Sequence, residues 1–361
     1  MEGKDLRVRR AVESLQEYVP VHPLEEIGAE LGIPVERLVK LDANENPYGC
    51  SAVVRDAIAC CASYHLYPDP EQRRLRAALA RYAGFPEDWL LAGAGSDELI
   101  DLLIRLVVEP EDRVLDAVPT FGMYSFLTPI QGGQVVSVPR RPDFSLDIPA
   151  LLAAIDERTK IIFVASPNNP SGNLAGREQI LALVETDLLV VVDEAYWEFS
   201  QESVADLVAT HENLVVMRTF SKWAGLAGLR VGYLIAAPSL LQHLWKIKQP
   251  YNVNTAAQVA ARAAIADLEH IQQTVARILA ERTRLLEMLA RIPFLQPYPT
   301  RANFILCRVE GRSARELRDA LRRRGVLIRY FDTPLLQNCV RVSVGRAEDT
   351  DRLREELLAL A

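Results

Sequence analysis

Long apolar runs are missing from this 361-residue sequence. No stretch approaches the roughly 20 consecutive apolar residues that cross a bilayer, and the N-terminal residues lack an apolar segment of signal-peptide length. We therefore expect a cytoplasmic protein without a membrane partner. Cysteine is also scarce, because the five cysteines form an odd set without zinc-ligand spacing. This pattern argues against a disulfide framework and predicts no metal site.

An excess of positive charge is missing too. The formal net charge is -7, so we expect no nucleic-acid partner, and an anionic ligand must be held by local arginines. The composition, 49% hydrophobic and 25% charged, is that of an ordinary globular protein. The length allows two domains of about 150 residues each.

A parallel sheet is predicted for the middle of the chain, where short apolar runs alternate with longer helical patterns. Its expected strands are Trp89–Ala92, Arg113–Ala117, Gln134–Pro139, Ile161–Ala165, Leu188–Val192, Leu214–Arg218 and Val231–Ile235. Several of these strands end next to polar residues. Functional side chains of open α/β sheets gather at the carboxyl ends of strands, so this edge is the expected site.

The pattern changes after Pro250, where a helical stretch from Thr255 to Ile292 precedes short strands and helices. The sequence therefore predicts an α/β fold with two domains. Residues 48–252 form a large domain with a mostly parallel central sheet flanked by helices, and residues 253–361 form a smaller α+β domain. Residues 1–47 are expected to be an N-terminal arm and part of the small domain.

Lys222 lies in a Gly-rich loop between two expected strands. A lysine that forms a Schiff base needs an amine on a flexible stem whose charge is suppressed, and Arg230 with the apolar flank can suppress it. Ser221 and Arg230 would bind a cofactor phosphate, which matches an arginine fork. An isolated loop lysine is usually only solvated, but the surrounding pattern favours the chemical role.

Asp193 ends an apolar strand and is placed to pair with a pyridinium nitrogen. A carboxylate there keeps the ring protonated, and a protonated ring stabilises a carbanion next to the imine. The alternative is that Asp193 caps a following helix. Tyr196 could reach the ring hydroxyl, although a tyrosine at a strand end is often half-buried packing.

Three further segments carry candidate cofactor contacts. Asn169 lies in a turn after an apolar strand and can donate to the ring oxygen, although such a turn can be purely structural. Ser96 and Asp97 open a helix whose backbone N–H groups can bind an anion, or they serve as its N-cap. Phe121 could stack on the ring, with core packing as the alternative.

Arg329 and Arg341 lie at or near strands late in the chain. A long cation is seldom buried by chance, so two of them predict an anion pocket. Structural ion pairs are the alternative explanation.

Taken in order, these motifs resemble the fold-type I pyridoxal-phosphate enzymes, and among them the histidinol-phosphate aminotransferases. The resemblance covers nearly the whole chain from Tyr18 onward. It includes Leu41-Asp-Ala-Asn-Glu-Asn-Pro-Tyr-Gly49, Tyr67-Pro-Asp69, Gly95-Ser-Asp-Glu98, Pro119-Thr-Phe-Gly-Met-Tyr124, Ser166-Pro-Asn-Asn-Pro-Ser-Gly172, Asp193-Glu-Ala-Tyr196, Ser221-Lys222, Arg230 and Val340-Arg-Val-Ser-Val-Gly345.

The resemblance implies that pyridoxal 5'-phosphate forms a Schiff base with Lys222. It assigns the pyridine nitrogen to Asp193, the ring oxygen to Asn169 and Tyr196, and the ring face to Phe121. The residues implied around the phosphate are Ser96, Asp97, Thr219, Ser221 and Arg230. The residues implied to contact substrate are Tyr18, Asn44, Arg329 and Arg341. The resemblance further implies a homodimer in which Tyr67 reaches the cofactor phosphate of the other subunit.

The implied reaction moves an amino group between L-histidinol phosphate and 2-oxoglutarate, giving imidazole acetol phosphate and glutamate in histidine biosynthesis. Lys222 would be the catalytic proton carrier, supported by Asp193 and Tyr196. An aromatic amino-acid aminotransferase or a threonine-phosphate decarboxylase would keep the same cofactor residues. A non-catalytic ligand-binding relative is a further alternative, but binding alone does not require a Schiff-base lysine.

Overall fold

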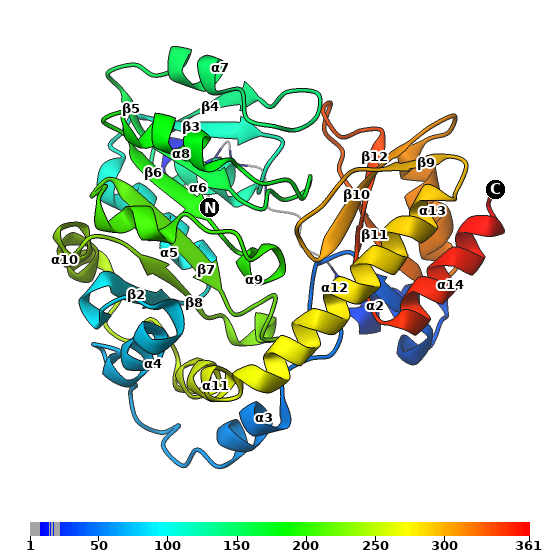
Figure 1. Ribbon diagram of the computed structural model, residues 1–361, viewed down its shortest axis with the longest axis horizontal. Coiled ribbons are helices and arrows are strands. Elements are labelled where there is room, and N and C mark those ends of the chain that lie inside the picture. The colour runs from blue at the N-terminus through cyan, green and yellow to red at the C-terminus, as the bar shows by residue number, and fades with distance from the viewer. Residues whose placement is uncertain (1–7, 14, 16, 18–21) are drawn as a thin grey trace, which may run out of the picture.

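Two sheets organise the protein in the computed structural model, which describes residues 8–13, 15, 17 and 22–361. A seven-stranded sheet forms the larger part of the molecule, on the left in Figure 1, and a five-stranded sheet forms the smaller part on the right. The long helix α12, Leu268–Ala290, runs from beside the larger part to the second sheet. No helix within the described ranges has the length and apolar composition of a bilayer span.

The seven-stranded sheet has the order β2-β8-β7-β6-β5-β3-β4. Its strands are β2 Leu90–Gly93, β3 Arg113–Val118, β4 Gln134–Pro139, β5 Thr159–Ala165, β6 Leu189–Asp193, β7 Leu214–Thr219 and β8 Gly232–Ile235. Strand β8 runs antiparallel to both neighbours, and the other adjacent strands are parallel. The expected α/β fold with a mostly parallel sheet is therefore confirmed.

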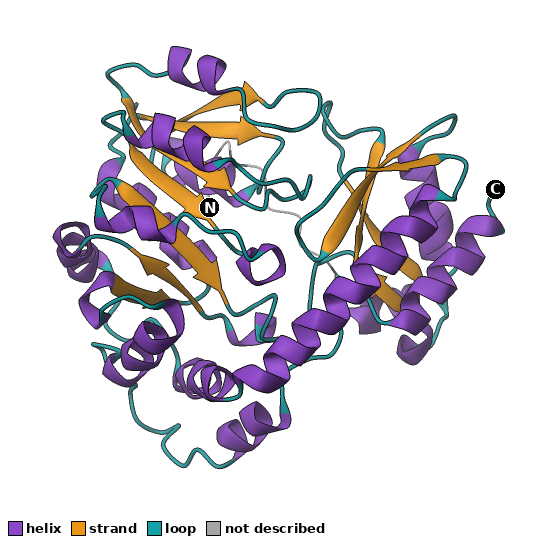
Figure 2. Ribbon diagram, in the orientation of Figure 1, coloured by secondary structure: helices purple, strands orange, loops and turns teal. Residues whose placement is uncertain are grey.

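Helices cover both faces of this sheet (Figure 2). Those on one face are α5 Ser96–Val107, α6 Met123–Ile130 and α10 Pro238–Ile247. Those on the other are α4 Arg73–Ala83, α7 Ile148–Ala153, α8 Arg177–Val184, α9 Trp197–Ser200 and α11 Thr255–Ala266. Because both faces are covered, every residue of β6 is buried, which explains why this strand reads as a continuous apolar run.

The five-stranded sheet has the order β1-β11-β12-β10-β9. Its strands are β1 Val39–Leu41, β9 Leu295–Pro297, β10 Phe304–Val309, β11 Val326–Tyr330 and β12 Cys339–Ser343. The helices α2 Leu24–Leu31, α13 Ala314–Arg323 and α14 Ala347–Leu358 belong to the same part of the molecule. Strand β1 pairs in parallel with β11, so residues 39–41 contribute to this sheet. The domain boundaries at 47/48 and 252/253 stay predictions.

Some local predictions need correction. The helical stretch expected from Thr255 to Ile292 is two helices, α11 and α12, because Asp267 leaves helical geometry with ψ of 41°. Strands β1 and β9 were not expected, since three residues each are too few to show a period. The remaining α-helices of the described residues are α1 Arg10–Glu13 and α3 Ala52–Ala59.

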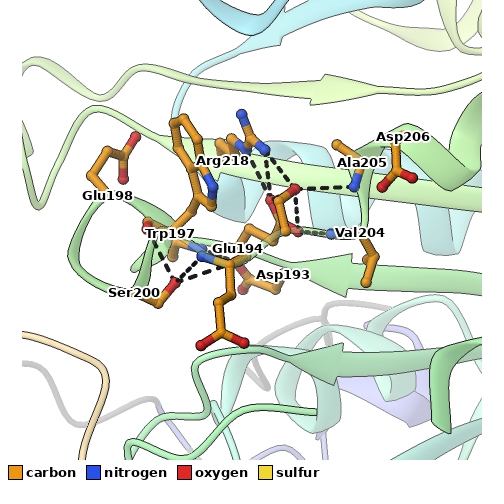
Figure 3. A network of polar contacts seen from close by, with 12 residues as sticks. Asp193, Glu194, Trp197, Glu198, Ser200, Val204, Ala205, Asp206 and Arg218 are labelled. Atoms are coloured by element: carbon orange, nitrogen blue, oxygen red, sulfur yellow. Dashed lines mark hydrogen bonds and ion pairs between the residues drawn. The ribbon is translucent and has the colours of Figure 1, made fainter. Parts of the chain in front are cut away.

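A buried ion pair joins the carboxyl ends of β6 and β7 (Figure 3). Arg218 Nη2 lies 2.8 Å from Glu194 Oε2, and the two side chains are 3% and 2% exposed. The Ser203 hydroxyl donates to both carboxylate oxygens at 2.9 Å, and the guanidinium lies 3.8 Å from the Trp197 ring centroid. Because Asp193 immediately precedes Glu194, this pair also anchors the end of β6 that faces the candidate site.

We expect Arg218→Met to lower the free energy of unfolding by about 3–5 kcal/mol, because it leaves a buried carboxylate without its partner. The matched control is Arg177→Met, which removes an exposed ion pair to Asp206 with an N–O distance of 2.6 Å and should cost less than about 1 kcal/mol. Denaturant unfolding measures both. Equal losses in the two variants would contradict this role of the buried pair.

Candidate active site

A cavity of about 780 Å³ lies at the carboxyl ends of the parallel strands and is closed from the other side by residues of the second sheet. It brings together most of the predicted site residues: Asn44, Ser96, Asp97, Phe121, Asn169, Asp193, Tyr196, Thr219, Ser221, Lys222, Arg230, Arg329 and Arg341. A cavity of this size accommodates a cofactor together with a small substrate.

Among the described residues, one predicted site residue does not line this cavity. Tyr67 is 81% exposed, and its ring stacks on Tyr251 with centroids 4.5 Å apart. Its expected contact is with a second subunit, so the position within one chain leaves that prediction untested. Tyr18 lies outside the described residues.

Lys222 follows β7, and its amine donates to the carbonyl of Ala43 at 3.2 Å. The pKa of Lys222 is lowered to about 8, mainly by burial and next by the positive charge of Arg341. The charge of Arg230 has a smaller effect in the same direction. The expected suppression of the lysine charge is therefore present, but its main cationic source is Arg341 in the second sheet. An amine with this pKa is neutral in a far larger fraction near neutral pH than an ordinary lysine, and the neutral form can act as a nucleophile or base.

Asp193 ends β6 and is 3% exposed. Its Oδ2 accepts the hydroxyl of Tyr124 at 2.7 Å, and its Oδ1 accepts the backbone N–H of Ala195 at 3.0 Å. Burial raises the pKa of Asp193 to about 6, the two hydrogen bonds oppose this rise, and the charges of Asp97 and Glu194 add to it. A buried carboxylate on a cavity wall suits a ligand that presents a cationic N–H group.

Tyr196 is 4% exposed and follows β6 by three residues. Its hydroxyl accepts the side-chain amide of Asn44 at 2.9 Å. The amide oxygen of Asn44 in turn accepts the hydroxyl of Ser343 at 2.8 Å. Tyr196 is thus tied to both the N-terminal segment and strand β12, and its position depends on contacts far apart in sequence.

Arg341 is 6% exposed and crosses from β12 toward the large sheet. Its guanidinium donates to the side-chain oxygen of Asn169 and to the carbonyl of Asp42, both at 2.6 Å. The first bond orients the Asn169 amide with its oxygen toward Arg341, so the NH2 group is the donor on the other side. Arg329 lies directly opposite Arg341 in the antiparallel pairing of β11 with β12.

Hydroxyl and guanidinium groups line another part of the cavity: Ser96, Thr219, Ser221 and Arg230. The Thr219 hydroxyl donates to that of Ser221 at 3.0 Å. Gly95, directly before α5, has φ of +82°, and a Cβ there would lie 2.4 Å from Arg230 Nη2. Glycine is therefore needed for the helix start to approach this guanidinium.

The side chain of Asp97 pairs with Arg230, with an N–O distance of 2.8 Å. The sequence prediction credited the backbone N–H groups of Ser96 and Asp97 with anion binding, because an acidic side chain would repel the anion unless it were turned away. In the structure this carboxylate turns toward Arg230. The side chains of Arg230 and Asp97 are 45% and 40% exposed, so water weakens the pair.

Two functional candidates were missed by the sequence reasoning. Tyr124 holds Asp193, and Asp116 of β3 lines the cavity while 2% exposed. Burial raises the pKa of Asp116 to about 7. The motif around Tyr124 was noted, but only its contact with Asp193, 69 residues away, reveals a role. Among the described residues no cluster of His, Cys, Asp or Glu is arranged to hold a metal ion.

Comparison with known proteins defines the class of this fold and site. Residues 36–357 match the model of the family described as aminotransferase class I and II, so the chain belongs to this family. The histidinol-phosphate aminotransferase of Roseiflexus castenholzii is 48% identical over 98% of both chains. The chloroplastic histidinol-phosphate aminotransferase of Nicotiana tabacum is 46% identical over 97% of this chain and 85% of its own length.

A solved structure agrees with these relatives. The crystal structure of histidinol-phosphate aminotransferase from Sinorhizobium meliloti in complex with pyridoxal-5'-phosphate has a TM-score of 0.89 to this chain, with 29% identity and 98% of both chains covered. Within its family the chain thus groups with the histidinol-phosphate aminotransferases, which confirms the resemblance carried by the motifs.

We expect Lys222 to react with a small aldehyde with a midpoint near pH 8, because only the neutral amine attacks and burial with Arg341 lowers its pKa to about 8. Borohydride trapping over a pH series, followed by peptide mapping, measures this. Lys40 is the internal control: burial lowers its pKa, but Asp42 and Glu45 more than offset this and leave it raised. A Lys222 midpoint as high as that of Lys40 would contradict the assignment.

Proposed function

We propose that this protein is a pyridoxal 5'-phosphate-dependent aminotransferase that transfers the amino group of L-histidinol phosphate to 2-oxoglutarate in histidine biosynthesis. The shared name of the relatives from R. castenholzii and N. tabacum supports the reaction. The S. meliloti complex supports the cofactor. Within this chain, the observation that carries the proposal is the pair of arginines on the cavity wall, Arg329 opposite Arg341.

Like charges in opposed cross-strand positions repel each other. An anion bound between Arg329 and Arg341 would remove this cost, and an arginine fork can bind either a phosphate or a carboxylate in bidentate fashion. Histidinol phosphate has a phosphorylated CH2OH group where an amino acid has its α-carboxylate, whereas glutamate carries two carboxylates. The same pair can therefore serve both half-reactions without a metal. Asn44 is the further substrate contact that we propose among the described residues.

The residues of the cavity fit pyridoxal 5'-phosphate. Asp193 offers a buried carboxylate for a ring N–H, and Lys222 offers an amine of lowered pKa for the covalent link. The missing side chain at Gly95 lets the Arg230 guanidinium lie against the start of α5, where it and the helix N–H groups can bind an anion together. We assign the ring oxygen to Asn169 and Tyr196 and the ring face to Phe121. The phosphate contacts are assigned to Ser96, Asp97, Thr219, Ser221 and Arg230.

The bound cofactor supplies an electron-withdrawing ring that stabilises the negative charge left on the substrate Cα when its proton is lost. Lys222 Nζ takes that proton and later returns one, acting first as base and then as acid. Its lowered pKa increases the fraction of the amine that is neutral. Asp193 keeps the ring nitrogen protonated, which makes the ring electron-withdrawing. Arg341, together with Arg329 opposite it, orients the substrate anion.

An aromatic amino-acid aminotransferase or a threonine-phosphate decarboxylase would use the same cofactor residues, so substrate preference decides between them. We expect kcat/KM for histidinol phosphate with 2-oxoglutarate to exceed that for phenylalanine by about thirtyfold or more, because losing one charge-assisted contact to a paired arginine costs about 2–5 kcal/mol. Steady-state assays with histidinol phosphate, phenylalanine and threonine phosphate measure this. A preference for phenylalanine, or carbon dioxide release from threonine phosphate, would overturn the substrate assignment.

We also propose a homodimer in which Tyr67 reaches the cofactor phosphate of the other subunit. The exposed rings of Tyr67 and Tyr251 support an interface here, because exposed aromatic surface is enriched in contact regions. Each proposed site takes Lys222 from one subunit and Tyr67 from the other. Lys222→Ala removes the first contribution, and Tyr67→Phe weakens the second. A mixed dimer then has one site with both Lys222 and Tyr67 intact.

Mixing the purified Tyr67→Phe and Lys222→Ala proteins should therefore restore part of the activity above the sum of the separate variants. Native mass spectrometry verifies that subunits have exchanged, and each variant incubated alone is the control. Absence of recovery in a sample with proven exchange would argue against a shared site, while the assignment of Lys222 would stand.

A further inference from the structure

We propose that Tyr124 is a positioning residue for the cofactor, whose hydroxyl orients the Asp193 carboxylate while its ring supports Phe121. This inference rests on the proposed function, because it assigns Asp193 and Phe121 to the cofactor ring. Tyr124 is the second residue of α6 and is completely buried. It is not among the residues that line the cavity, so it would act through its two neighbours.

The hydroxyl contact fixes the plane of the carboxylate. Tyr124 donates to Asp193 Oδ2 at 2.7 Å, and the backbone N–H of Ala195 donates to Oδ1 at 3.0 Å. One donor on each oxygen leaves the carboxylate a single orientation. A short hydrogen bond to an ionised acceptor is about twice as strong as a neutral one, and its buried position increases the cost of losing it.

The ring contacts prevent the hydroxyl from moving. Tyr124 stacks on Phe163 of β5 with centroids 4.6 Å apart and planes 5° from parallel. Its edge meets Phe121 at 5.7 Å with an interplanar angle of 84°. Stacked and edge-on pairs are the preferred aromatic geometries. One side chain therefore links the sheet, the carboxylate for the ring nitrogen and the aromatic residue for the ring face.

The charges around this group determine the direction of its effect. Asp97 from α5 and Glu194 after β6 both face Asp193 and disfavour its ionisation, as does burial. Asp116 from β3 and the hydroxyl of Tyr196 face Tyr124 itself. The hydrogen bond from the Tyr124 hydroxyl stabilises the ionised form of Asp193, so it opposes the effects of burial, Asp97 and Glu194 on that carboxylate. Without that donor, Asp193 becomes a stronger base.

A stronger base at Asp193 draws the proton away from the ring nitrogen. The ring then carries less positive charge and stabilises negative charge at the substrate Cα less well. The reduced positive charge on the ring also raises the pKa of the Lys222 nitrogen, because a nearby positive charge disfavours a proton on that nitrogen. The hydroxyl of Tyr124 should therefore influence cofactor binding, the pH dependence of the cofactor's visible absorption, and turnover.

The test is Tyr124→Phe in the full chain, reconstituted with pyridoxal 5'-phosphate. We expect the dissociation constant for the cofactor to rise about tenfold, as for the loss of a hydrogen bond to a charged group. The pH midpoint of the visible absorption should rise. The value of kcat should fall while KM changes little, because the variant removes no contact to substrate.

Tyr82→Phe is the matched control. The Tyr82 hydroxyl also donates to a buried carboxylate, Glu198, at 3.1 Å, and its ring also stacks, on Trp223 with centroids 5.1 Å apart. Glu198 does not line the cavity. This variant should lower stability while leaving the absorption midpoint and the cofactor dissociation constant near those of the wild type.

A second variant keeps the test decisive if Tyr124→Phe fails to fold. Site-specific 3-fluorotyrosine at position 124 retains the ring and provides a more acidic hydroxyl, which is a stronger donor. The absorption midpoint should then fall, opposite to the change expected for phenylalanine. Opposite shifts of the two variants support the proposal, whereas a midpoint unchanged in the fluorinated protein would overturn it.

The remaining outcomes separate this inference from the proposed function. If Tyr124→Phe matches the wild type in cofactor affinity and absorption midpoint, Tyr124 has no positioning role and the proposed function stands. Equal effects of Tyr124→Phe and Tyr82→Phe would reveal a general packing defect and also overturn the inference. If the wild-type protein itself neither binds pyridoxal 5'-phosphate nor transfers an amino group, the proposed function fails instead.

Discussion

Glu194 and Arg218 place opposite charges in a region from which water is excluded, and their surroundings compensate both charges. Ser203 and the Val204 N–H complete the hydrogen bonding of the carboxylate, and the Trp197 face covers the guanidinium. Such a pair tolerates little displacement, because each charge is costly without the other. It joins β6 to β7 at the edge where the candidate site lies. The positions of neighbouring cavity residues therefore depend on it.

The cavity wall itself holds charges that are unfavourable in isolation. Burial raises the pKa of Asp193 and lowers that of Lys222, and Arg329 faces Arg341 across two paired strands. Titratable groups shifted in opposite directions within one cavity are typical of sites prepared for proton transfer. These charges lower the stability of the fold. They also make the cavity complementary to a ligand that carries an N–H group and anionic groups.

The two sheets meet at the segment that follows β1. The side chain of Asn44 forms hydrogen bonds with Tyr196, which follows β6 of the large sheet, and with Ser343 of β12. The carbonyl of Asp42 accepts a hydrogen bond from Arg341. Asn44 adopts φ of +55°, a left-handed conformation that asparagine tolerates better than most residues. A short turn in the N-terminal segment thus aligns residues of both sheets around one cavity.

The sequence by itself determined the strands of the large sheet and the chemistry at their ends. Most of these strands are largely apolar, Asp193 ends one of them, and Asn169 and Lys222 follow the ends of two others within four residues, so local pattern suffices. Only the tertiary structure decided that Tyr124 holds Asp193, that Arg341 rather than Arg230 has the larger effect on Lys222, and that β1 pairs with β11. These contacts join segments far apart in the chain. They depend on register and packing, which no local period of the sequence encodes.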